Sequence, residues 1–124
     1  MITDITMNEM LEGLPSLDDN VHLLMFFGPT CGPCQATMPH YETAAEFYTE
    51  KNAQIKFYRI NAWEPEEQAA FCREKMNVSG VPTFRAYYHS EQIFEKVGGG
   101  DEEAVKKFIH DIVDETFKRF GVKI

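Results

Sequence analysis

The sequence predicts an α/β domain with a mixed central β-sheet flanked by helices. Three observations lead to this fold class. Residues 22–60 show a strand–helix–strand pattern, whose right-handed crossover makes the two strands parallel. Residues 83–97 alternate as an antiparallel hairpin does, and an amphipathic stretch after Asp101 closes the chain. A sheet with both parallel and antiparallel neighbours follows.

Composition limits the classes of function. The chain has 124 residues, 44% of them hydrophobic, so we expect one folded domain over 1–124. A net charge of −8 argues against nucleic acid as a partner, because phosphate binding needs clustered Lys and Arg. No apolar run reaches the roughly 18 residues of a membrane span. The acidic segment 1–20 does not resemble a signal peptide. We therefore expect a cytoplasmic protein without a membrane partner, and a monomer suffices.

The first elements are short. A short edge strand is predicted over residues 2–5. Thr6 and Glu9 match a capping box, which predicts a helix over 7–13. A loop rich in Pro, Ser and Asp over 13–20 then leads into the first long strand.

A long helix is expected over 33–50, between the apolar strands 22–27 and 54–60. Pro39 falls inside this helix and should kink it, because proline removes one backbone hydrogen bond. Apolar residues recur every three or four positions, which predicts the buried stripe Cys34, Met38, Tyr41, Ala45 and Tyr48.

The second half begins with a predicted helix over 66–75, with Pro65 at its first position. A turn at His89–Ser90 separates the hairpin strands 83–88 and 92–97. After the Gly98–Gly100 break, Asp101 caps the closing helix. The predicted buried stripe of that helix is Val105, Phe108, Ile109, Ile112, Val113 and Phe117.

The sequence Cys31-Gly32-Pro33-Cys34 stands where the first long strand gives way to the helix. Two cysteines at this spacing can close or open a small disulfide ring. The free N–H groups and positive dipole end of a helix N-terminus favour a thiolate on Cys31. In a reducing compartment this pattern favours redox chemistry or metal binding over a structural disulfide.

The alternative is a zinc site that adds Cys72 and His40 to the two cysteines. Their spacing matches no standard zinc motif, so no metal is expected. Cys72 is predicted to be a core thiol. The other histidines are interpreted as strand-end, turn and helix-surface residues without a sequence-local partner that would make them bases: His22, His89 and His110.

Together these features resemble the thioredoxin family over nearly the whole chain. The matching signature is Cys31-Gly32-Pro33-Cys34 after a strand, Pro39 five residues past Cys34, Gly80-Val81-Pro82-Thr83 before the hairpin, and Lys96-Val97-Gly98 after it. The resemblance implies a thioredoxin-like fold.

The resemblance also implies residue roles. Cys31 would attack a substrate disulfide and Cys34 would resolve the mixed disulfide. Pro82 would be a cis-proline facing the disulfide. Backbone groups of Val81 would pair with an extended substrate segment. The implied motif residues are Thr30, Gly32 and Pro33, and the implied substrate-binding residues are Gly80, Val81, Pro82, Thr83, Gly98, Gly99 and, at the same sheet edge, Trp63.

The chain departs from the family at several positions. Thr30 and Phe27 stand where thioredoxins usually carry tryptophans. Met25 and Arg59 align with a buried Asp and Lys of many members. We expect Arg59 to reach solvent or find another carboxylate. Without the Asp, Cys34 is expected to lose its proton to water or to the leaving group on the first cysteine.

Trp63 is the only tryptophan and follows the second parallel strand. We hypothesise that it partly covers the disulfide in place of the tryptophan replaced by Thr30. The alternative is a loop aromatic that caps the core.

The function implied is a thiol–disulfide oxidoreductase that reduces protein disulfides through the Cys31/Cys34 dithiol. A thioredoxin-reductase-type partner would regenerate it, and no organic cofactor is needed because the cysteines carry the electrons. Two alternatives remain: a disulfide oxidase or isomerase, and a non-catalytic binding subunit that uses the docking face around Val81 and Gly98.

Overall fold

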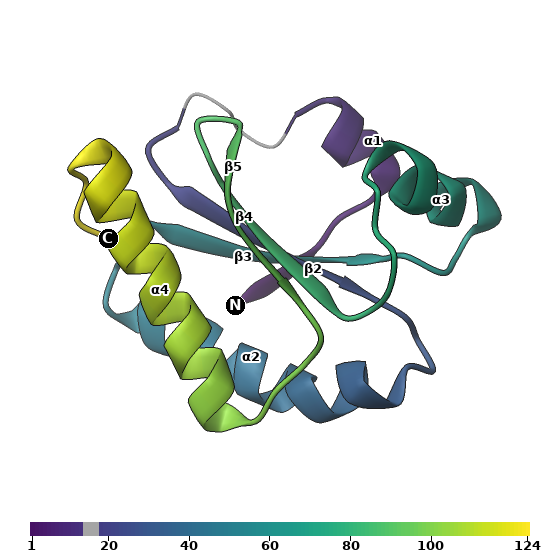
Figure 1. Ribbon diagram of the computed structural model, residues 1–124, viewed down its shortest axis with the longest axis horizontal. Helices are drawn as coiled ribbons and strands as arrows, with labels where there is room; N and C mark the ends of the chain where they lie inside the picture. The colour runs from purple at the N-terminus through teal and green to yellow at the C-terminus, as the bar shows by residue number, and fades with distance from the viewer. Residues whose placement is uncertain (14–17) are drawn as a thin grey trace.

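The computed structural model describes residues 1–13 and 18–124, and its centre is a five-stranded sheet in the order β1-β3-β2-β4-β5 (Figure 1). Part of the predicted loop over 13–20 lies outside the described residues. In chain order the elements are β1 (Ile2–Asp4), α1 (Met7–Leu11), β2 (Val21–Phe27), α2 (Gly32–Glu50), β3 (Ile55–Asn61), α3 (Glu66–Ala70), the π-helical segment η1 (Phe71–Lys75), β4 (Thr83–Tyr88), β5 (Glu91–Val97) and α4 (Glu102–Phe120).

The sheet is mixed, as predicted. β1 and β2 both pair with β3 in parallel, so the strand–helix–strand unit through α2 is confirmed. β4 pairs antiparallel with β2 and with β5. The two turn residues His89 and Ser90 have φ of 50° and 68°, which matches the left-handed pair that a tight hairpin needs. This order places the end of β2 beside the start of β4. The segment that follows β2 and the segment that precedes β4 form the site described below.

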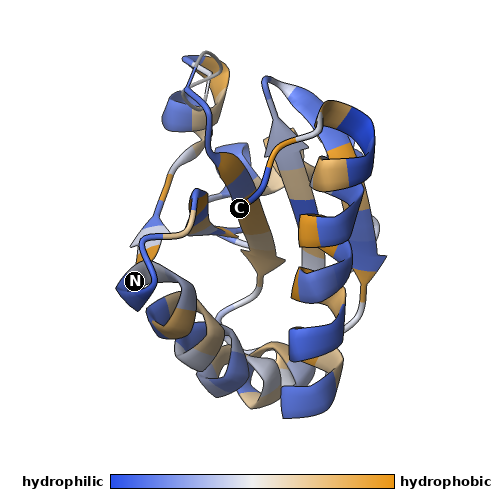
Figure 2. Cartoon of the chain, turned by 90° about the vertical axis from the view of Figure 1, so that its left-hand side faces the viewer, coloured by the Kyte–Doolittle hydropathy of each residue, from blue (hydrophilic) through white to orange (hydrophobic). Residues whose placement is uncertain are grey.

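Helices cover both faces of the sheet (Figure 1). The α2/α4 face is packed by α2 and α4, and the α1/α3 face by α1, α3 and η1. Hydrophilic and hydrophobic residues alternate along α4 (Figure 2), and those that it buries are mostly apolar: Val105, Phe108, Ile109, Ile112 and Thr116. None of the helices in the described residues is long and apolar enough to cross a membrane.

The caps of α1 and α4 form at the residues that the sequence predicts. Thr6 and Glu9 form the predicted capping box of α1. Asp101 accepts the N–H of Ala104 at 2.9 Å and so begins α4. The buried stripe of α4 differs at its end, where Val113 is only half-buried, Thr116 is buried and Phe117 is exposed. The prediction for Phe117 is wrong because 105, 109, 112 and 116 follow the helical period and 117 lies one step, about 100°, away.

The predicted helix over 66–75 is divided in the structure. α3 ends at Ala70 and continues as η1, in which the N–H of Met76 bonds to the carbonyl of Phe71 at 3.1 Å. Pro65 precedes the first helical residue instead of being it, and the Glu64–Pro65 bond is cis. In contrast, α2 continues through Pro39 as one helix.

Candidate active site at the strand–helix junction

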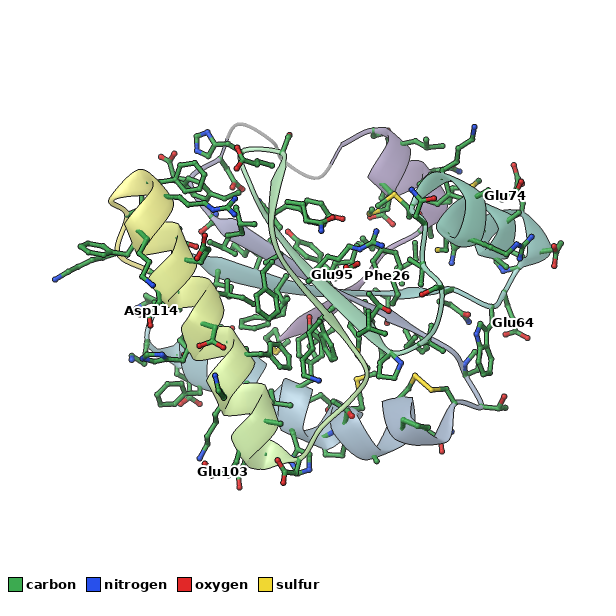
Figure 3. The ribbon with its side chains drawn as sticks, in the orientation of Figure 1. Phe26, Glu64, Glu74, Glu95, Glu103 and Asp114 are labelled. Atoms are coloured by element: carbon green, nitrogen blue, oxygen red, sulfur yellow. A yellow bond between two sulfur atoms is a disulfide. The ribbon has the colours of Figure 1, made fainter. Side chains whose placement is uncertain are left out.

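Cys31 and Cys34 form a disulfide at the first turn of α2, with their Cα atoms 5.2 Å apart. It is the yellow sulfur–sulfur bond drawn over the start of that helix in Figure 3. Cys31 is the N-cap, and its Sγ accepts the N–H of Cys34 at 3.2 Å. A helix N-terminus stabilises negative charge, so this environment favours a thiolate on Cys31 once the bond is reduced.

The two sulfurs differ in accessibility. Cys31 is 6% exposed and Cys34 only 1%. The residues flanking Cys31 are exposed: Thr30, Gly32 and Pro33. An incoming group can therefore reach the pair from the side of Cys31.

The loop before β4 lies directly beside the disulfide. The Val81–Pro82 bond is cis, and the carbonyl oxygen of Val81 lies 3.8 Å from the Sγ of Cys31. The hydroxyl of Thr83 donates to the carbonyl of Gly80 at 2.6 Å and so fixes the loop from within. Pro82 and Val81 thus stand next to the sulfur pair, where the sequence placed them.

The segment after β5 forms the other side of the site. The N–H of Gly98 donates to the carbonyl of Pro82 at 2.8 Å. Gly98 has φ of +100°, a conformation that favours glycine. A Cβ on Gly99 would lie 3.1 Å from the carbonyl oxygen of Pro33, so glycine permits close contact with α2. The predicted docking residues of two separate segments, the loop before β4 and the glycines after β5, therefore lie together beside the start of α2.

Trp63 lies at the same edge of the sheet, in the loop after β3. Its indole packs on Gly28, in the turn before the cysteine motif, where a Cβ would overlap the ring. The exposed Trp63 also lines a pocket with Gly80 and Val81. Its placement next to the motif agrees with the sequence, and its role as a cover for the disulfide remains a prediction.

Met25 and Arg59 stand where many thioredoxins carry a buried Asp and Lys, and their surroundings here are different. Met25 is fully buried in the core. Arg59, opposite Met25 in the sheet, forms an ion pair with Asp4 on β1 and stacks over Phe27 at 5.4 Å. Its side chain is 32% exposed. The prediction that Arg59 reaches solvent or finds another carboxylate is confirmed, since it does both.

Cys72 is remote from the other cysteines. It is a free thiol, 1% exposed, in the apolar cluster of the α1/α3 face, and burial raises its pKa to about 11. The prediction of a core thiol is confirmed. Among residues 1–13 and 18–124, no group of three His, Cys, Asp or Glu side chains could hold a metal ion.

The sequence interpretation of the histidines is wrong in one respect. His22 is buried, and its Nε2 lies 2.9 Å from Asp18 while its Nδ1 lies 2.9 Å from the hydroxyl of Tyr58. His110 likewise lies 3.4 Å from Asp114. Both carboxylates are four residues away in sequence, a spacing that could have been checked. The His22 cluster lies near the start of β2, at the opposite end from the cysteines, so it belongs to another part of the molecule.

Comparisons with known proteins agree with this geometry. The family model described as Thioredoxin matches residues 4–111. Thioredoxin 1 of Plasmodium falciparum is 28% identical over 88% of this chain and 95% of its own length. A protein disulfide-isomerase of Aspergillus oryzae is 33% identical over 70% of this chain but only 16% of its own length. Among solved structures, the short form of spinach chloroplast thioredoxin f superposes with a TM-score of 0.74 at 22% identity, covering 92% of each chain. These similarities confirm the fold class and the resemblance found in the sequence.

Proposed function

Because the chain belongs to the thioredoxin family of thiol–disulfide oxidoreductases, we propose that it reduces the disulfides of other proteins. The observation that supports this proposal is the Cys31–Cys34 pair at a helix N-terminus, 3.8 Å from the backbone of the cis-proline loop. The substrates are disulfides of other proteins, and the electrons pass from this protein to them. Each step uses residues of this site.

The first step is attack by Cys31. In the reduced protein its thiolate forms a bond to one sulfur of a substrate disulfide, and the substrate's S–S bond breaks. The departing sulfur leaves as a thiolate and takes a proton from water. The N–H of Cys34 and the dipole of α2 stabilise the attacking thiolate.

The second step is attack by Cys34 on the sulfur of Cys31. The mixed disulfide breaks, the second substrate sulfur leaves as a thiolate, and the Cys31–Cys34 bond forms. Two electrons have then passed to the substrate. Burial of Cys34 keeps it from outside disulfides until this step. Since Met25 offers no base, the proton of Cys34 passes to water or to the leaving group on Cys31.

Substrate docking uses the backbone around the disulfide. An extended substrate segment pairs with Val81, in the way that a strand adds to a sheet edge. Gly80, Pro82 and Thr83 shape this side of the surface, and the glycines after β5 shape the other. These backbone contacts suit many sequences, so the class of substrate is protein cystines rather than one small molecule.

The oxidised protein needs a source of two electrons. We assign this to a thioredoxin-reductase-type partner, so that the protein acts as an electron carrier in cell redox homeostasis with no cofactor beyond its own disulfide. A cytoplasmic setting and a monomeric state complete the proposal.

The test is reduction of insulin disulfides by the dithiothreitol-reduced protein, with the reduction potential measured against glutathione on the same sample. We expect turnover and a potential close to about −270 mV, the value typical of thioredoxins. Absence of turnover overturns the proposal.

Similarity to protein disulfide-isomerases supports a second candidate, an oxidase or isomerase. A potential near about −180 mV would favour it. A binding subunit without redox chemistry would be favoured if the double variant Cys31→Ser/Cys34→Ser kept the full biological role of the protein.

A further inference from the structure

Thr37 is a polar side chain buried in α2, one helical turn after Cys34. Its hydroxyl donates to the carbonyl of Pro33 at 2.8 Å and accepts the backbone N–H of Gly100 at 3.1 Å. The first bond lies within the helix. The second joins the redox helix to the glycine segment after β5, 63 residues away in sequence.

The same segment has other fixed contacts. Gly98 donates to the carbonyl of Pro82 at 2.8 Å, and the Nζ of Lys96 donates to the carbonyls of Gly98 and Gly99 at 3.3 and 3.1 Å. A Cβ on Gly99 would overlap the hydroxyl of Thr37. The segment is thus held between the cis-proline loop on one side and the Thr37 hydroxyl on the other.

We propose that Thr37 is a positioning residue, whose hydroxyl holds the Gly98–Gly100 segment at a fixed distance from the Cys31–Cys34 disulfide. The proposal rests on the proposed function, because this segment forms one side of the substrate-docking surface. The hydroxyl bonds to backbone atoms of Pro33 and Gly100 and not to sulfur. The Thr37 hydroxyl therefore affects how substrate binds to the docking surface, and it leaves the chemistry of the two thiols unchanged.

The variant Thr37→Val keeps the shape of the side chain and removes both hydrogen bonds. We expect the KM for insulin to rise about three- to ten-fold, the effect of about one lost hydrogen bond, with kcat unchanged. The reduction potential and the rate of reduction by dithiothreitol stay at wild-type values. Thr37→Ser restores the hydroxyl and the wild-type KM.

Two other threonines provide matched controls. Thr116 is buried in α4 and Thr43 is exposed on α2, and each donates to the carbonyl four residues before it, at 2.8 and 2.9 Å. Thr116→Val and Thr43→Val remove the same kind of intrahelical bond, and in the wild type the bond of each hydroxyl stays within its own helix instead of reaching the glycine segment. We expect both to leave the KM unchanged, whatever they do to stability.

A second route to the same segment is Gly99→Ala, which leaves Thr37 in place. The new Cβ meets the Thr37 hydroxyl and displaces the segment, so the KM rises. In the background Thr37→Ala the hydroxyl is gone, and Gly99→Ala raises the KM by a smaller factor. This coupling links the two positions directly, and it remains measurable if the valine variant fails to fold.

Amide hydrogen exchange at Gly100 tests the contact independently of activity. We expect faster exchange in Thr37→Val than in the wild type and in Thr37→Ser. If KM and exchange are both unchanged in Thr37→Val, or if Thr37→Ser does not restore them, the inference is overturned. A wild-type protein that fails to reduce insulin overturns the proposed function instead, and exchange at Gly100 then still decides whether Thr37 holds the segment.

Discussion

The two faces of the sheet bury cysteines to nearly the same degree but surround them with different groups. On the α2/α4 face, Cys31 is 6% exposed and receives a backbone N–H at a helix N-terminus. On the α1/α3 face, Cys72 is 1% exposed among apolar side chains, and burial raises its pKa to about 11. Burial alone therefore does not decide reactivity. The orientation of nearby backbone dipoles does.

Buried polar side chains, in contrast, are hydrogen-bonded on both faces. The α1/α3 face carries three large ones, and each has its partners. His22 lies between Asp18 and Tyr58. Gln68 accepts the N–H of Met7 in α1 and donates to the carbonyl of Asn61 at the end of β3. Arg85 bonds to Glu95 at 2.9 Å. In the described part of the chain every buried side-chain N or O atom is hydrogen-bonded. Groups satisfied in this way stabilise the fold and have no capacity left for a substrate.

The largest expected effect is on insulin reduction, which should depend on Cys31 and Cys34 but not on Cys72. Cys31→Ser should lower insulin reduction at least about 1,000-fold, because removal of a covalent nucleophile eliminates the pathway. Cys34→Ser should stop turnover and trap mixed disulfides, visible on non-reducing gels. Cys72→Ser is the matched control and should keep wild-type turnover. Loss of turnover in Cys72→Ser would break the contrast between the two faces.

Alkylation of the reduced protein sharpens the contrast. With a pKa of about 11, Cys72 is only about 0.1% thiolate at pH 8, so iodoacetamide should modify it at least about 100-fold more slowly than Cys31. Peptide mass spectrometry after short reaction times measures both rates. In urea the protection of Cys72 should vanish. Equal rates in the folded protein would show that its buried environment does not govern the thiol.

Much of this could be predicted from the sequence because it depends on local signals. The Cys31–Cys34 spacing, the capping box at Thr6 and the glycines after β5 each dictate a conformation within a few residues. The tertiary placement of the redox motif followed from the order of strands and helix, since the ends of β2 and β3 must share one edge.

The features that could not be predicted from the sequence depend on contacts between segments that are distant along the chain. Nothing local distinguishes Thr37 from an ordinary helical threonine, because its second hydrogen bond goes to Gly100. The partner of Arg59 comes from an edge strand 55 residues away. The sequence predicts a buried Phe117 because it is apolar, whereas the helical period turns position 117 away from the sheet and buries Thr116 instead.

A moderate effect on stability is expected at the His22 cluster. Tyr58→Phe removes the hydroxyl that contacts Nδ1 of His22, and we expect a loss of about 1 kcal/mol or more in the free energy of unfolding. Urea denaturation measures this loss. Insulin reduction should remain unchanged. A several-fold fall in turnover with intact stability would mean that this face also contributes to the reaction.

The pH dependence of the same cluster provides a further check. Burial acts to raise the pKa of Asp18, but hydrogen bonds from the Asn20 backbone and from His22 outweigh it and hold this pKa below its ordinary value. A lowered carboxyl pKa stabilises the folded state above about pH 4, and the contribution is lost as pH falls through the lowered pKa. Asp18→Asn should therefore be less stable than the wild type near neutral pH, and the difference should shrink as the pH falls through the lowered pKa of Asp18.

The smallest expected effect concerns the ion pair between Asp4 and Arg59. Asp4 is 68% exposed and Arg59 32%, so Asp4→Asn should change the free energy of unfolding by only about 0–1 kcal/mol. The pH profile of the resolving step, measured by rapid mixing with a mixed disulfide on Cys31, should be the same in both proteins. Asp4 bonds to Arg59 and lies on the edge strand β1, so we expect it to take no part in removing the proton of Cys34. A carboxylate inflection that disappears only in Asp4→Asn would show that the α2/α4 face does hold a base, and that the carboxylate missing at Met25 has been replaced from β1.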